Sequence, residues 1–279
     1  LYLYINITIM SIRMRTVNVD VKYLIMDKLL KEFCFGQRCE DFLVNLIFKG
    51  KKDGIFMDVG AHDGIRFSNS YAFSVLGWKG ICVEAHPDYY EICYNNRHND
   101  STKIMNLACS WNDTESITFY SNYRGSLSTL NPNLNEVYKR DYKGYYVDKN
   151  HSEKVNNFTN GPIEVIARKM DTIIEENKEF LNDGNIDLIS IDVDGSEEFV
   201  LRGFDILKYK PRVIILEVSV VRNVVEEYMK SKDYYKLYDN KLNAIYCRDK
   251  EDYELFTSEL YKLRNTELVS VDTGHPLGN

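Results

Sequence analysis

The sequence predicts an α/β protein built on one mostly parallel sheet, with helices on both faces. Short apolar runs alternate with helical segments along most of the 279 residues, and strands spaced by helices are typical of parallel sheets. The runs at 186–191 and 212–217 are strongly apolar, as expected for buried strands. A chain of this length can form one large α/β domain or two small ones, each with a real core.

The N-terminal part is predicted to be helical. Over residues 18–50 apolar side chains recur at three- and four-residue spacing, so we expect a helical extension, residues 1–50, ahead of a main domain over 51–279. The first ten residues are apolar but too short to span a bilayer, and they lack the flanks of a signal peptide. They fit either a short edge strand or translated upstream sequence, since the first methionine is Met10.

The main domain is predicted to alternate strands with helices. The expected strands are 55–59, 80–84, 103–108, 116–120, 163–167, 186–191, 212–217 and 243–247, and the expected helices are 68–76, 87–95, 170–181, 197–207 and 223–231. Residues 121–162 interrupt the alternation, because they are rich in Asn, Tyr, Ser, Gly and Lys and have little apolar periodicity. A loop this long in a compact domain is usually functional or disordered.

Composition and charge argue against several classes of function. The 35 Lys and Arg against 42 Asp and Glu give a formal net charge of −7, so the chain has no basic field for a nucleic acid and none is the expected partner. No stretch approaches the length of a transmembrane helix, and no membrane association is expected. The six cysteines lack zinc-ligand spacing, although Cys34 and Cys39 flank a turn at Gly36. We interpret them as buried reduced thiols, which predicts a reducing, cytoplasmic location.

The residues after the first two strands of the main domain predict a nucleoside site. In a parallel sheet of this kind, ligands bind at the carboxyl ends of the strands, where the strand order reverses. The first strand ends in a glycine-rich turn, in which Gly60 lets a ligand approach the backbone and Gly64 brings the next helix close. Glu84 ends the next strand, 24 residues after Gly60, where a carboxylate can accept both ribose hydroxyls.

The kind of nucleoside follows from what this turn contains. It lacks the G-x-G-x-x-G pattern of dinucleotide sites and starts with the acidic residue Asp58. A carboxylate there can balance the ammonium group of S-adenosylmethionine, directly or through water. The turn and Glu84 together therefore favour a site for S-adenosylmethionine, with S-adenosylhomocysteine as its product. The alternative, that these glycines and acids only terminate strands, is less favoured.

Two ordered signatures resemble those of the FkbM family of methyltransferases, over roughly residues 54–250. The first comprises FMDVGAHDG at 56–64, SNS at 68–70, GWKG at 77–80, VEAHP at 83–87 and NR at 96–97. The second is IDLISIDVDGSE at 186–197, with MDT at 170–172 and LRG at 201–203. The resemblance implies the Rossmann-like, seven-stranded, mostly parallel sheet of class I methyltransferases. It also implies methyl transfer to oxygen, often on a sugar hydroxyl in a glycan or natural product.

The resemblance also implies which residues hold the cofactor. The expected cofactor-binding residues are Asp58, Gly60, Ala61, His62, Gly64, Ser68, Glu84, Ala85, Leu107, Ala108 and Cys109, with the last three beside the adenine. His62, His86 and Asp194 depart from the family's usual residues, and these departures concern the substrate rather than the cofactor. Residues 121–162 would form an insertion at the acceptor site, since loops carry specificity in this architecture.

Asp192 and Glu217 are the candidate catalytic residues. Asp192 follows a wholly apolar strand and is expected to act as a general base or to anchor the acceptor hydroxyl. Glu217 ends the neighbouring strand and would either orient the same hydroxyl or cap the next turn. Asp192 and Asp194 could instead bind a divalent cation, or acids could simply favour a helix N-terminus. We expect no metal, and a structural role for Asp194.

Two other functions compete with sugar O-methylation. RNA ribose 2′-O-methylation commonly uses a Lys-Asp-Lys-Glu set at successive strand ends, but Glu217 stands where the second lysine is expected. The acidic net charge also argues against RNA. A catalytically idle module would keep Glu84 and the glycine turn and act only by binding. Turnover of the cofactor distinguishes it from an enzyme.

Overall fold

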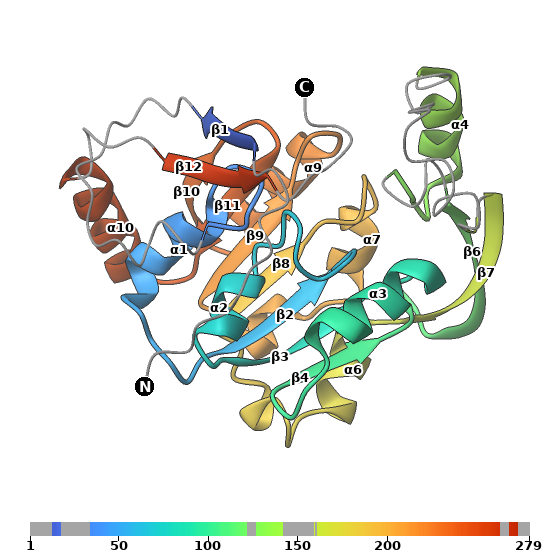
Figure 1. The fold of residues 1–279 in the computed structure, drawn as a ribbon, viewed down its shortest axis with the longest axis horizontal. Helices are drawn as coiled ribbons and strands as arrows, with labels where there is room; N and C mark the ends of the chain where they lie inside the picture. Colours follow the sequence, from blue (N-terminus) through green and yellow to red (C-terminus); the bar gives the residue numbers. More distant parts are fainter. Residues whose placement is uncertain are drawn as a thin grey trace.

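A seven-stranded sheet lies at the centre of the computed structural model (Figure 1). The structure describes residues 13–17, 34–121, 127–141, 159, 161–262 and 268–272. The strand order is β10-β11-β9-β8-β2-β3-β4. The strands are β2 (Ile55–Val59), β3 (Lys79–Val83), β4 (Thr102–Met105), β8 (Leu188–Ile191), β9 (Val213–Glu217), β10 (Tyr235–Asp239) and β11 (Asn243–Cys247).

The direction of the strands confirms the predicted fold class. Strands β4, β3, β2, β8 and β9 pair in parallel, whereas β11 is antiparallel to both β9 and β10. The chain runs outward from β2 to β3 and β4, then returns to the other side of β2 as β8 and β9. The strand order therefore reverses between β2 and β8, which is where this architecture places its ligand.

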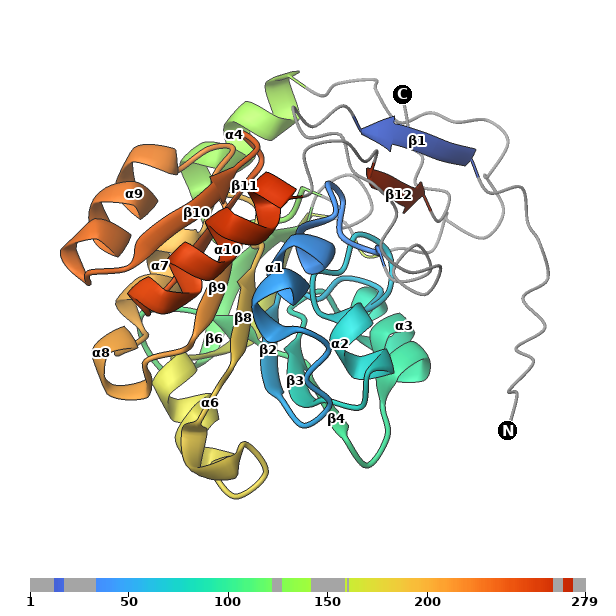
Figure 2. The same ribbon diagram turned by 90° about the vertical axis from the view of Figure 1, so that its left-hand side faces the viewer.

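Helices cover both faces of the sheet, as the two views show (Figure 2). One face packs against α1 (Glu40–Phe48), α2 (Tyr71–Val75), α3 (Pro87–Arg97) and α10 (Lys250–Lys262), and the other against α6 (Met170–Glu176), α7 (Glu197–Arg202), α8 (Ile206–Tyr209) and α9 (Arg222–Ser231). Strand β2 is buried along its whole length, because alternate side chains serve the two cores: Phe56 faces the first group of helices, and Met57 the second.

A second sheet departs from the predicted arrangement. Strands β5 (Ala108–Cys109), β6 (Thr114–Ser121) and β7 (Gly161–Arg168) form a separate three-stranded sheet in the order β5-β7-β6. The expected strand 103–108 is therefore divided between two sheets. The division falls at Asn106, whose side-chain amide donates to the carbonyl oxygens of Glu84 and Ala85 (2.9 and 3.2 Å) and holds the chain where it leaves the main sheet.

Residues 121–162 do not form one uninterrupted loop, because the structure has helix α4 (Pro132–Asp141) within them. The Asn131 Oδ1 atom accepts hydrogen bonds from the backbone N–H groups of residues 133 and 134 (3.0 and 3.3 Å), and Pro132 suits the first helical position. The Asn-Pro pair was thus a helix start signal that the low apolar periodicity concealed. Residues 122–126, 142–158 and 160 lie outside the described part.

Residues 13–17 and 268–272 form a small sheet that the sequence did not predict. Strand β1 (Arg13–Val17) pairs antiparallel with β12 (Leu268–Asp272). The expected strand within the first ten residues and the expected helix before residue 34 lie outside the described residues. No described helix combines the length and the apolar character needed to cross a bilayer.

The cysteine interpretation is wrong for one pair. Cys34 and Cys39 form a disulfide with their Cα atoms 5.2 Å apart, which the turn at Gly36 permits: the Cys39 N–H donates to the Gly36 carbonyl oxygen (3.1 Å). The other four cysteines are free and buried, as expected (Cys82, Cys93, Cys109 and Cys247). The cytoplasmic location stays a prediction.

Asp41, in the first turn of α1, makes the stability of the fold depend on pH. Its Oδ2 atom accepts from the Phe35 N–H (2.7 Å), but its Oδ1 atom is buried without a hydrogen-bond partner among the described residues, and burial raises the pKa to about 7. Between about pH 4 and pH 7 the unfolded chain ionises Asp41 while the folded chain keeps it protonated, so rising pH favours unfolding.

We expect Asp41→Asn to remove this contribution of Asp41 to the pH dependence of stability. Relative to the wild type, the variant should gain on the order of 2–4 kcal/mol in unfolding free energy between pH 4 and pH 8. Urea denaturation at both pH values measures this, and the other buried acids cancel because both proteins contain them. A difference between the proteins that does not change with pH would assign Asp41 an ordinary pKa.

Candidate active site

A cavity of about 400 Å³ lies at the carboxyl ends of β2, β3, β8 and β9, at the reversal of strand order. It is large enough for a nucleoside. Of the predicted site residues, twelve line it: Asp58, Gly60, Ala61, His62, Ser68, Glu84, Ala85, Leu107, Ala108, Cys109, Asp192 and Glu217.

Gly64 is the predicted cofactor residue that does not line the cavity. Its φ is +81°, and a Cβ there would lie 2.8 Å from the Cys93 Sγ atom and 2.7 Å from the Arg97 Cδ atom. Its place in the fold is therefore to let the turn pack closely on α3, which agrees with the close helix approach expected from the sequence.

Gly60 joins the two halves of the site. Its φ is +85°, and a Cβ there would lie 1.7 Å from the carbonyl oxygen of Asp192, at the end of β8. The N–H groups of Gly60 and Ala61 both donate to the Val83 carbonyl oxygen (2.9 and 3.1 Å), which ties the turn to β3. Only glycine permits this close approach, so the glycine turn and the Asp192 turn are one structural unit.

Asp58 is less free than the sequence suggested. Its Oδ2 atom accepts from the hydroxyls of Ser68 and Ser70 (3.1 and 2.5 Å) and pairs with the buried Arg97 guanidinium (3.4 Å). Arg97 therefore offsets part of the charge that was expected to balance an ammonium group. Asp58 stays in the cavity wall, and its contact with the cofactor stays a prediction.

Glu84 has the fixed geometry that ribose recognition requires. Its two carboxylate oxygens accept from the backbone N–H groups of His86 and His62 (both 2.7 Å), so the carboxylate cannot rotate away from the cavity. Burial raises its pKa to about 7, although these two hydrogen bonds oppose the shift. Each oxygen retains a lone pair for a hydroxyl donor.

The wall beside Glu84 suits an uncharged ring. Ala85, Leu107, Ala108 and Cys109 supply small or apolar surface, and burial raises the pKa of the Cys109 thiol to about 12, so that it is neutral. The His62 ring packs against Tyr89, with centroids 3.7 Å apart. The fixed carboxylate, the apolar wall and the cavity volume fit the nucleoside of S-adenosylmethionine.

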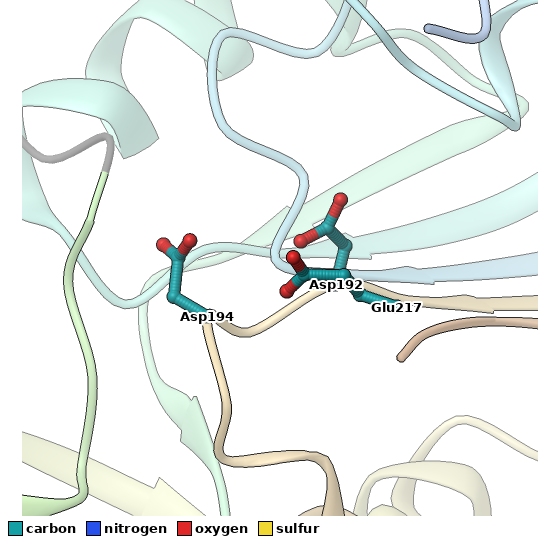
Figure 3. Close-up of side chains that lie close together, drawn as sticks. All are labelled: Asp192, Asp194 and Glu217. Atoms are coloured by element: carbon teal, nitrogen blue, oxygen red, sulfur yellow. The ribbon is translucent and has the colours of Figure 1, made fainter. Parts of the chain in front are cut away.

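Three carboxylates gather at the other end of the cavity (Figure 3): Asp192 and Asp194 follow β8, and Glu217 ends β9. One oxygen from each lies within 4.8 Å of the others. Asp192 is accessible from the cavity, but the surrounding protein and the charge on Glu217 hold its pKa well above the usual range. Burial, followed by the charge on Glu197, raises the pKa of Glu217 to about 7.

Sequence reasoning missed the residues that hold this cluster in place. The fully buried Glu197 accepts, through Oε1, the N–H groups of Val193 and Gly195 (3.0 and 3.3 Å) and so supports the Asp194 turn. From the 121–162 segment, the Ser128 N–H donates to the Asp194 carboxylate (3.1 Å), and the Tyr138 hydroxyl donates to its carbonyl oxygen (3.2 Å). Two signals pointed this way, the position of Glu197 after an apolar strand and the expected acceptor-site insertion over 121–162, but neither gave the individual contacts.

The lining of the cavity does not fit the set used in RNA ribose methylation. No lysine is among the described residues that line it, whereas the Lys-Asp-Lys-Glu set requires two.

The sheet order, the cleft at its reversal point and the glycine turn with Glu84 define a class I methyltransferase. The family model of the methyltransferase FkbM domain matches residues 58–235, well over half of the chain. The protein therefore belongs to the FkbM methyltransferase family, and its methyl donor is S-adenosylmethionine.

Other comparisons add little. A search of curated proteins gave no match. Among solved structures, the METTL16 MTase domain is 12% identical with TM-score 0.41 and covers 82% of this chain and 71% of that one. The O-methyltransferase from Bacillus cereus in complex with SAH is 12% identical with TM-score 0.37 and covers 80% and 93%. These similarities are too weak to argue a substrate.

Proposed function

We propose that this protein transfers the methyl group of S-adenosylmethionine to a hydroxyl oxygen of a sugar, a glycan or another small polar acceptor. The observation that carries the proposal is the carboxylate cluster of Asp192, Asp194 and Glu217, which lies in the same cavity as the Glu84 wall. Carboxylates accept hydrogen bonds from hydroxyls, and several at one place suit an acceptor with several hydroxyls.

The proposed reaction joins a methyl donor beside Glu84 to an acceptor beside the carboxylate cluster. The acceptor oxygen would attack the methyl carbon in line, the bond from that carbon to the sulfonium sulfur would break, and its electron pair would return to sulfur. S-Adenosylhomocysteine results, and the hydroxyl proton passes to a carboxylate, for which Asp192 is our candidate. Glu217 would orient the acceptor from the neighbouring strand end.

The segment 121–162 would shape the acceptor side. Its described part reaches the cluster through Ser128 and Tyr138, which both bind Asp194. This contact supports the interpretation of the segment as an acceptor-site insertion, separate from the part of the domain that holds the cofactor.

Cofactor binding is tested at Glu84. We expect Glu84→Ala to weaken S-adenosylmethionine binding by about 1–3 kcal/mol, because the ribose loses its hydrogen-bond acceptors. Titration calorimetry measures this, with Glu91→Ala as the matched control, since Glu91 is exposed on the neighbouring helix α3. Binding of NAD but of neither S-adenosylmethionine nor S-adenosylhomocysteine would overturn the cofactor assignment.

The acceptor class is tested by mass spectrometry. The protein is incubated with S-adenosylmethionine and separate panels of sugars, glycans and RNA oligonucleotides. Methylation of a sugar or glycan hydroxyl supports the proposal. Methylation of RNA alone would contradict it, and cofactor binding without turnover on any panel would favour the idle binding module.

A further inference from the structure

The carboxylate cluster raises a question of charge. Asp192, Asp194 and Glu217 bring one oxygen each within 4.8 Å of one another, and Figure 3 shows the carboxylates of Asp192 and Glu217 side by side with Asp194 facing them. None of the described lysines or arginines forms an ion pair with any of the three: Arg66, which lines the cavity, pairs with Asp63, and the buried Arg97 pairs with Asp58. Like charges this close repel strongly unless a cation or protons neutralise them.

A second observation concerns one oxygen of Glu217. Only 9% of this residue is exposed. Its Oε1 atom accepts a hydrogen bond from the Ser219 hydroxyl (2.6 Å), whereas its Oε2 atom is buried without any hydrogen-bond partner among the described residues. A buried carboxylate oxygen without a hydrogen-bond donor costs free energy, so this atom is suited to bind a cation.

The cluster is also held rigidly. Asp194 stands at φ +50° in a turn that Glu197 supports from behind through two backbone N–H groups, and the Ser128 N–H fixes its carboxylate at 3.1 Å. Glu217 is fixed at the end of a central strand. Oxygen ligands supported in this way are prearranged, as a metal site requires.

We propose that Asp192, Asp194 and Glu217 bind one divalent cation, Mg²⁺ or Mn²⁺, at the acceptor end of the cleft. Hard cations of this kind prefer carboxylate oxygens and keep further positions for water or substrate oxygens. The sequence predicted no metal because a structural role for Asp194 was favoured and only Asp192 and Asp194 were considered as cation ligands. The structure adds Glu217 and its unpartnered oxygen to the set.

The role of the cation rests on the proposed function. A cation bound here would coordinate acceptor hydroxyls, lower the pKa of the one that reacts and place it before the methyl group. The cation site itself can be tested without any acceptor.

The test is Mn²⁺ binding to the full chain, measured by electron paramagnetic resonance and by calorimetry. We expect one site, which Glu217→Gln and Asp194→Asn each weaken at least about tenfold. Glu227→Gln, an exposed carboxylate on α9, is the control and should bind as the wild type does. S-Adenosylhomocysteine binding in EDTA verifies that every variant is folded.

The outcomes separate this inference from the proposed function. S-Adenosylhomocysteine binding without a Mn²⁺ site, or a Mn²⁺ site unaffected by both variants, would overturn the cation proposal and leave the methyltransferase standing. If both variants lose the Mn²⁺ site and the wild type methylates no hydroxyl, the cation proposal stands and the proposed hydroxyl acceptor is contradicted. Once an acceptor is known, turnover should stop in EDTA and return with Mg²⁺ or Mn²⁺.

Discussion

Asp192→Asn is expected to lower turnover roughly 10²–10⁴-fold, the usual range for the loss of a positioned base. Asparagine keeps the size of the side chain and one oxygen acceptor, but it cannot take the hydroxyl proton. The affinity for S-adenosylhomocysteine should change little, because Glu84 and the glycine turn, rather than the Asp192 side chain, are the groups proposed to hold the nucleoside. Steady-state kinetics on a verified acceptor, together with calorimetry, measure both quantities.

Asp53→Asn is the matched control, since Asp53 is exposed before β2 and should leave both quantities unchanged. Near-normal turnover of Asp192→Asn would make Asp192 structural and Glu217 the next candidate. Joint loss of cofactor binding and activity would place Asp192 in the cofactor pocket. If Mn²⁺ affinity falls together with turnover, Asp192 acts through the proposed cation rather than as a free base.

The central strands were predictable because strands that are buried on both faces have continuous apolar sequences. The expected strand 55–59 has the bounds of β2, and the apolar runs later in the chain contain β8 and β9. Edge strand β10 was missed, because its residues are exposed or half-buried and its sequence, Tyr-Lys-Leu-Tyr-Asp, has no continuous apolar run. Helix α10 was missed although it packs on the same core as α1.

Some features of the site were likewise predictable from the sequence, and others were not. Strand-end residues such as Glu84 and Asp192 could be found from the sequence, since parallel strands bring their carboxyl ends to one edge of the sheet. The pairing of Arg97 with Asp58 and the support of Asp194 by Ser128 depend on contacts between segments 39 and 66 residues apart. No local pattern encodes such contacts. The disulfide had a local signal at Gly36, but the choice between thiol and disulfide depends on geometry that spacing does not determine.

Gly60→Ala is expected to damage the site and the fold together. At φ +85° any L side chain is strained by about 1–3 kcal/mol, and the new Cβ would lie 1.7 Å from the Asp192 carbonyl oxygen, so β2 and β8 would have to separate at the floor of the cleft. Overpacking of this kind adds about 1–3 kcal/mol, so the unfolding free energy should fall by roughly 2–6 kcal/mol. S-Adenosylmethionine binding should be lost, because the turn proposed to hold the cofactor would move.

Gly50→Ala is the matched control that separates strain from collision. Gly50 has a similar φ of +72°, but nothing lies within 4 Å of the position of its Cβ, so the substitution carries the strain alone. Urea denaturation should place Gly60→Ala below Gly50→Ala by the cost of the collision, and calorimetry should find cofactor binding intact only in Gly50→Ala. Equal stability of the two variants, with binding retained in both, would mean that the glycine turn and the Asp192 turn do not depend on their close approach. In that case the coupling of cofactor wall and acceptor cluster through Gly60 would have to be abandoned.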